Sequence, residues 1–140
     1  EGERPDIVSN QLYGTVAYAY LILLFNNIND PLFDWPLHSR QFENYIISKY
    51  GSVANALSNI KHYYQIIRAE VPKTGLSERI PEVKIIVDQT TYNTLQESSR
   101  STISDYEWED EKNEEKRSIR LIDPDIIQDV DYALKRTFAN

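Results

Sequence analysis

The side chains best suited to chemistry in this sequence are two histidines and its many serines and carboxylates. His38 and His62 fall in different predicted elements, and a metal or acid–base site would need partner groups brought close by the fold. No residue at helical or strand spacing supplies such a partner, so we interpret both as structural or surface histidines. The serines lack a G-x-S-x-G nucleophile elbow, and the 4 glycines are too scattered for a phosphate-binding loop. Acids alone leave a carboxylate pair for glycoside hydrolysis open, but such a pair needs a cleft and a raised pKa. The sequence therefore predicts no enzyme, no cofactor and no small-molecule substrate.

The carboxylates concentrate between Asp105 and Glu115, where seven of eleven residues are acidic. A calcium-binding loop would place acids at alternate positions with a glycine at its bend. Acidic residues do occupy the alternate positions 105, 107 and 109, but the glycine at the bend is missing and the 12-residue spacing of such a loop is not met. We therefore interpret this stretch as a solvated charged face.

The bulk composition narrows the classes of partner. The chain has 140 residues, about the size of one domain, and a net charge of −7 with a pI near 4.8. Nucleic-acid binding needs a basic surface, so this charge argues against nucleic acid as a partner. The absence of cysteine excludes disulfides, zinc–cysteine sites and thiol catalysis. The apolar run Val16 to Phe25 is far short of the ~20 residues that a membrane span needs.

The first third of the chain is predicted to form helices that are joined by turns. A helix is expected from Pro5 to Leu12, with Gly14 ending it, and Thr15 is expected to cap a second helix that runs to Phe25. The second helix is apolar on nearly all sides, which predicts neighbours on more than one face, from this chain or another. The segment Asn26 to Pro31 is typical of a turn that ends this helix.

An aromatic loop follows this turn and leads into two more predicted helices. The loop contains Phe33, Trp35, Pro36 and Leu37. Such residues either bind a partner or close a small hydrophobic core, and the sequence does not decide between these two interpretations. We then expect a helix capped by Ser39 and closed after Tyr50 by Gly51, and a short helix from Ser52 to Leu57.

Strand signals appear after residue 59. We expect strands over Ile60 to Arg68 and Val83 to Val87, a third over Thr102 to Trp108, and a short one over Ser118 to Ile122. Asp123 and Pro124 are expected to start a last helix. The fold class is therefore α+β, with a helical half over residues 1–59 and a smaller mixed half of strands and helices over residues 60–140.

Several stretches of the chain resemble known families. The opening EGERPDIVSNQLYG, followed by AYLILLFNNINDP, is similar to a LysM module, a small β-α-α-β unit. The continuation NNINDPLFDWPLHSRQFENYIISKYG resembles the LysM-containing baseplate wedge protein of contractile-tailed, T-even-like bacteriophages. The segment NEEKRSIRLIDPDIIQDV is similar to the C-terminal region of that family. One departure is that a LysM module begins with a strand, so that strand either lies before Glu1 or is missing.

This resemblance implies a non-enzymatic structural subunit of the virion. Members of the family sit in the tail baseplate, contact other wedge and hub proteins, and help to join wedges into a six-fold hetero-oligomer. Assembly then takes place in the host cytoplasm, without nucleic acid or membrane as partners. The alternative is a carbohydrate-binding LysM module with a shallow groove between the first helix and the loop at residues 26–32. For the wedge subunit, the expected protein interface comprises Tyr18, Leu21, Phe25, Asn27, Phe33, Trp35, Pro36 and Leu37.

Overall fold

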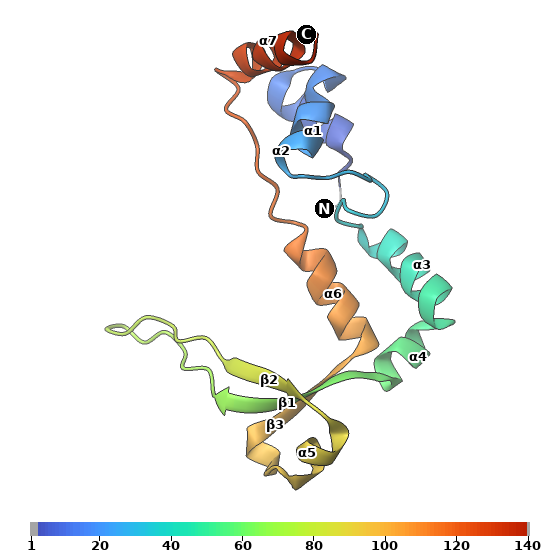
Figure 1. Cartoon of the computed structure of the whole chain (residues 1–140), viewed down its shortest axis with the longest axis vertical. Coiled ribbons are helices and arrows are strands. Elements are labelled where there is room, and N and C mark those ends of the chain that lie inside the picture. The colour runs from blue at the N-terminus through green and yellow to red at the C-terminus, as the bar shows by residue number, and fades with distance from the viewer. Residues whose placement is uncertain (1–2, 140) are drawn as a thin grey trace. The chain divides into compact units, whose positions relative to one another are not determined.

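The computed structural model describes residues 3–139, which form an α+β fold (Figure 1). The α-helices are α1 (Pro5–Tyr13), α2 (Ala19–Phe25), α3 (Ser39–Tyr50), α4 (Val53–Ser58), α5 (Gln89–Thr94), α6 (Asp105–Glu115) and α7 (Ile127–Phe138). Two 3-10 helices are η1 (Val16–Tyr18) and η2 (Glu97–Ser99), and the strands are β1 (Ile60–Arg68), β2 (Val83–Val87) and β3 (Arg100–Ser104). The chain divides into two compact units. The first joins the residues up to Asn44 with those from Lys112 onward, and the second is Tyr45–Glu111.

The first unit is built around a small core between α2 and the C-terminal segment. Leu21, Ile122 and Ile127 are buried together, and the partly buried side chains of Tyr13, Tyr18, Val130 and Leu134 pack against them. The helix expected from Pro5 is confirmed, and Gly14 ends it in the left-handed conformation at φ 71°, which glycine adopts at little cost. Thr15 caps the 3-10 helix η1, which precedes α2, by accepting a hydrogen bond from the Ala17 N–H at 3.2 Å.

The segment Ser118–Ile122 is extended but is not a strand, so this expectation was wrong. At Arg120 and Ile122 its backbone groups are satisfied by side chains and not by a neighbouring strand. The Asn26 amide accepts from the Arg120 N–H at 2.7 Å and donates to the Arg120 carbonyl at 2.8 Å. The Tyr13 hydroxyl accepts from the Ile122 N–H at 3.1 Å and donates to the Ile122 carbonyl at 2.8 Å. An alternating sequence pattern cannot distinguish this arrangement from a sheet.

The last helix begins at Ile127, three residues after the predicted start at Pro124. A turn occupies the intervening residues. The Asp123 carboxylate accepts from the Asp125 N–H at 2.9 Å, and the Asp123 carbonyl accepts from the Ile126 N–H at 3.1 Å. Aspartate thus caps a turn here instead of the helix itself.

The second unit contains a sheet in which β1 pairs with β2 and β3, both antiparallel. Strands β1 and β2 are confirmed over their predicted ranges. The Tyr63 ring lies 4.9 Å from the ring of Tyr92 in α5, and the His62 ring lies 4.9 Å from Trp108 in α6. Because successive strand residues point to opposite faces, α5 and α6 cover opposite faces of the sheet.

The third strand is β3, which ends at Ser104, so the predicted extension to Trp108 was wrong. A capping box explains the change from strand to helix. The Ser104 hydroxyl accepts from the Glu107 N–H at 3.2 Å, and the Glu107 carboxylate accepts from the Ser104 N–H at 2.8 Å. Residues 105–108 consequently form the first turn of α6.

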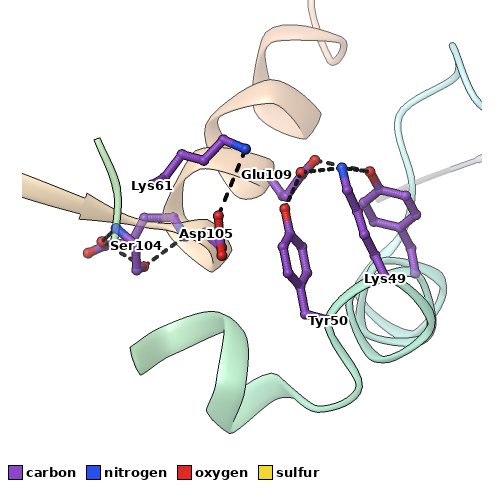
Figure 2. Close-up of polar contacts among 8 residues, drawn as sticks. Lys49, Tyr50, Lys61, Ser104, Asp105 and Glu109 are labelled. Atoms are coloured by element: carbon purple, nitrogen blue, oxygen red, sulfur yellow. Dashed lines mark hydrogen bonds and ion pairs between the residues drawn. The ribbon is translucent and has the colours of Figure 1, made fainter. Parts of the chain in front are cut away.

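Helix α6 is not a wholly solvated acidic face, because Glu109 and Asn113 are buried on one side of it. In the second unit the Glu109 carboxylate accepts from Lys49 Nζ and the Tyr50 hydroxyl, both at 2.7 Å, and from the Tyr45 hydroxyl at 3.1 Å. Figure 2 shows Lys49 and Tyr50 converging on this carboxylate, with the weaker Lys61–Asp105 ion pair at 3.9 Å nearby. Burial raises the pKa of Glu109, but the hydrogen bonds from Lys49 and Tyr50 outweigh it, and the net pKa is lowered.

The structure leaves the LysM comparison unconfirmed, because residues 3–59 contain helices and no strand. The domain boundary expected at residue 59 divides the sequence into two consecutive regions, and it stays a prediction. In the structure, residues 45–59 belong to the same compact unit as the sheet. No helix within residues 3–139 is long and apolar enough to cross a membrane.

Candidate protein interface

Helix α2 buries one side and exposes the other. Leu21 and Ile22 are buried, whereas Tyr20, Leu24 and Phe25 keep between 41% and 47% of their surface exposed. The sequence predicted neighbours on more than one face of this helix, and the chain itself covers only one of its sides. An exposed apolar surface of this kind is typical of a protein contact.

A tight turn fixes the C-terminal end of α2. The Asn26 side chain donates to the Ile22 carbonyl at 2.7 Å, and the Ile28 N–H donates to the Leu23 carbonyl at 2.9 Å. Between them Asn27 adopts a left-handed conformation, φ 54°, which asparagine tolerates better than most residues. The exposed Asn27 side chain is thus held at a defined position.

The aromatic loop begins with a segment that two aspartates organise. The Asp30 carboxylate accepts from the Leu32 N–H at 2.9 Å, and the Asp34 carboxylate accepts from the Asp30 N–H at 3.1 Å. Lys116 Nζ donates to the Phe33 carbonyl at 2.6 Å. The Phe33 residue nevertheless stays 65% exposed. The loop therefore presents this ring on a backbone that is held at several points.

The end of the loop is buried. Trp35 is only 7% exposed, and its indole N–H donates to the Glu3 carbonyl at 2.8 Å. Pro36 is buried beside it in the sequence, and Leu37 is half-buried. The Asn113 amide donates to the Leu37 carbonyl at 3.0 Å and accepts from the Leu37 N–H at 2.7 Å. The burial of Trp35 agrees with the plug interpretation of this loop, whereas a binding anchor stays a prediction for the exposed Phe33.

A groove of about 790 Å³ runs between the start of α1 and the aromatic loop. Its walls are mostly apolar, and the charged or polar side chains of Glu3, Arg4, Asp6, His38 and Gln41 also line it. The apolar lining consists of Pro5, Ile7, Ala19, Pro31, Leu32, Trp35, Pro36 and Leu37.

The other edge of the exposed α2 surface meets α7. The Tyr20 hydroxyl hydrogen-bonds the Asp131 carboxylate, which also pairs with Lys135 at 2.8 Å. Burial and the bond to Asp131 raise the pKa of Tyr20 to about 12, so this tyrosine is neutral at physiological pH. Within residues 3–139 no group of three or more acidic or histidine side chains is placed to hold a metal ion.

A comparison with protein families decides the class of this molecule. A phage family model described as base plate wedge protein 53 matches residues 1–134. The chain belongs to this family. It is therefore a structural protein of the phage baseplate, located in the virion tail in association with other baseplate proteins. No curated protein and no solved structure matches the chain.

In this member of the base plate wedge family, the structure separates the eight predicted interface residues into two groups. Phe25, Asn27 and Phe33 are exposed at the end of α2 and in the loop. The remaining residues are buried or half-buried; they are Tyr18, Leu21, Trp35, Pro36 and Leu37.

Sequence reasoning missed the side chains that hold the loop and the extended segment, namely Tyr13, Asn26, Asn113 and Lys116. A signal existed for one of them. Glu109 and Asn113 are spaced i,i+4 in α6, so they share a helix face, and an uncharged asparagine within an acidic run marks that face as the buried one.

Proposed function

We propose that this member of the base plate wedge family joins neighbouring wedge proteins during baseplate assembly. It would contact wedge and hub proteins in a six-fold hetero-oligomer that assembles in the host cytoplasm. The family match over residues 1–134 supports this role. The resemblance of the Asn26–Gly51 segment to wedge proteins supports it independently of the fold.

We further propose that Phe25, Asn27 and Phe33 make the contact to a wedge partner, while Trp35 and Leu37 position them. Exposed aromatic side chains surrounded by polar groups are common anchors of protein interfaces. The loop backbone is already tied down at Asp30, Phe33 and Leu37, so binding would order few additional residues. Such preorganisation lowers the entropic cost of association.

Reconstitution of wedges with the full chain tests this interface. Phe33→Ala should weaken wedge joining by about tenfold, the usual effect of losing a strong anchor. Tyr132→Ala is the matched control, because this aromatic residue of α7 is comparably exposed at 69%. Ring formation, counted by electron microscopy, is the measurement. Equal ring yields for both variants would contradict the assigned interface, and rings that form equally well without the chain would contradict the joining role.

A LysM-type carbohydrate-binding function is the second candidate, and the groove between α1 and the loop is the observation that favours it. The lining argues for a protein segment instead, because sugar recognition needs many hydrogen-bonding groups and this groove is mainly apolar. Titration with chitin or peptidoglycan fragments decides between them. Saturable binding that is lost in Gln41→Ala or His38→Ala would favour the carbohydrate.

A further inference from the structure

Strand β2 is an uncovered edge of the sheet in the second unit. In the described part of the chain it pairs with β1 only, so its other side offers unpaired backbone donors and acceptors. Its side chains are open on both faces. Ile85 is 47% exposed on one face and Ile86 is 59% exposed on the other, since neighbouring strand residues alternate.

The opposite edge strand, β3, is not exposed in this way. Ile103 in β3 is buried, and three of its other residues are half-buried, whereas four of the five residues of β2 are exposed. Figure 1 shows β2 continuing from a hairpin arm that extends from the sheet. Paired hydrogen bonds of 2.9 Å between Val71 and Ile80 hold this arm together.

Proteins often protect an edge strand with an outward-pointing lysine. The lysine of β2 does not serve in this way. Lys84 Nζ lies 4.5 Å from the ring centroid of Tyr64 in β1, so the ammonium group is directed back over the face of the sheet. The edge of β2 is therefore left apolar and unblocked.

Carboxylates bound this edge at both ends. Glu82 precedes the strand, where its carboxylate lies 4.0 Å from Lys84 Nζ, and Asp88 follows the strand. Hydrogen bonds from Thr91 lower the pKa of Asp88 and keep it ionised. Two copies of β2 paired antiparallel around Ile85 would place Glu82 of one copy opposite Asp88 of the other, twice. Like charges directly opposite in a sheet are destabilising, which disfavours a second copy as the occupant.

We propose that β2 accepts an extended segment of another baseplate protein as a fourth strand, and that this segment is apolar at its centre and carries Lys or Arg at both ends. Backbone pairing along Val83–Val87 supplies the affinity, as in other cases of strand addition. The two basic ends face Glu82 and Asp88, roughly 20 Å apart at the rise of a strand.

This surface belongs to a different unit from the aromatic loop, so the inference rests on family membership and not on the interface assigned to Phe33. Hydrogen–deuterium exchange of the full chain, alone and in reconstituted wedges, tests it. Those amides of Val83–Val87 that do not pair with β1 should exchange about tenfold more slowly in the wedge than in the free chain. Unchanged exchange in the wedge overturns the proposal. Slowing that follows the concentration of the isolated chain also overturns it, because the occupant would then be a second copy.

Two variants separate the edge from the rest of the surface. Ile86→Lys should abolish the slowing, whereas Leu57→Lys, which replaces a residue of α4 that is 54% exposed, should preserve it. Equal effects of the two variants contradict a specific edge contact. Circular dichroism of each variant confirms that it is folded.

The predicted basic ends are tested with synthetic heptapeptides that share the core Val-Thr-Val-Ile-Val and carry lysine or glutamate at both ends. The lysine-ended peptide should bind the full chain about tenfold more tightly, and Glu82→Gln combined with Asp88→Asn should remove that preference. Asparagine can still cap α5, so this variant keeps the local fold. No binding, or no preference, overturns the charge assignment, and neither result depends on the proposed wedge-joining role.

Discussion

Asn113 makes two hydrogen bonds to the backbone of Leu37, donating to its carbonyl at 3.0 Å and accepting from its N–H at 2.7 Å. The residue is 4% exposed, so water cannot replace these bonds. One side chain of α6 thereby performs the pairing that a neighbouring strand would provide. This contact fixes the point at which the aromatic loop enters α3.

Replacing Asn113 with leucine of similar size should lower the free energy of unfolding by about 2 kcal/mol, because both backbone groups of Leu37 lose their partner. Urea denaturation of the full chain measures the effect. Asn55→Ala is the control, since the exposed Asn55 amide donates only to the Tyr50 carbonyl at 3.2 Å. A loss for Asn113→Leu no larger than that of the control would show that the pairing contributes little.

The Tyr13 hydroxyl serves the extended C-terminal segment in the same way. Tyr13→Phe keeps the ring and its edge-on contact with Tyr18, 5.8 Å away, but removes both bonds to Ile122. We expect a loss of about 1–2 kcal/mol and faster amide exchange at Ile122. Tyr132→Phe changes an exposed hydroxyl and should have no effect. If Ile122 exchange is unchanged in Tyr13→Phe, the segment is held by packing alone.

Local signals predicted most elements because the determinants are close together in the sequence. Pro5 and Gly14 bound α1, Ser52 caps α4 by accepting from the Asn55 N–H, and β-branched residues mark β1. Each of these features depends on backbone preferences within a few residues. The third strand was misjudged at its end because the capping box of Ser104 was overlooked.

The long-range contacts could not be predicted in this way. Asn26 and Arg120 are 94 positions apart, and a turn-forming asparagine gives no sign of a distant backbone partner. The aromatic loop shows the same limit. Composition identified it as important, but only the fold shows that Trp35 is buried and Phe33 is exposed, since both are large aromatic residues flanked by aspartate or proline.

Trp35→Ala should unfold or strongly destabilise the chain, at a cost of about 3–5 kcal/mol, because it empties a buried site. Trp35→Phe retains most of the packing and removes the indole hydrogen bond to Glu3, for about 1 kcal/mol. Thermal melting measures both changes. Ring assembly by the folded Trp35→Phe protein should remain normal, because the buried Trp35 side chain is only 7% exposed and offers little surface to a partner. Defective assembly with normal melting would instead assign Trp35 to the interface.

The cluster around Glu109 should make the stability of the second unit depend on pH at both ends of the scale. The pKa of Glu109 is lowered from its ordinary 4.5, so its contribution is present above that pH and is lost as the pH falls through the folded pKa. Burial and the bond to Glu109 raise the pKa of Tyr50 from 10.0 to about 12, so its contribution is complete below pH 10 and is lost as the pH rises toward 12.

Glu109→Gln should lower the free energy of unfolding by about 1–3 kcal/mol near neutral pH, and the difference from the unsubstituted chain should shrink in acid and in base. Denaturant titrations across the pH range measure this difference. Glu107 and Asp131 also have lowered pKa values but are present in both proteins, so their effects cancel. A difference that stays constant with pH would show that the Glu109 carboxylate contributes packing and no charge.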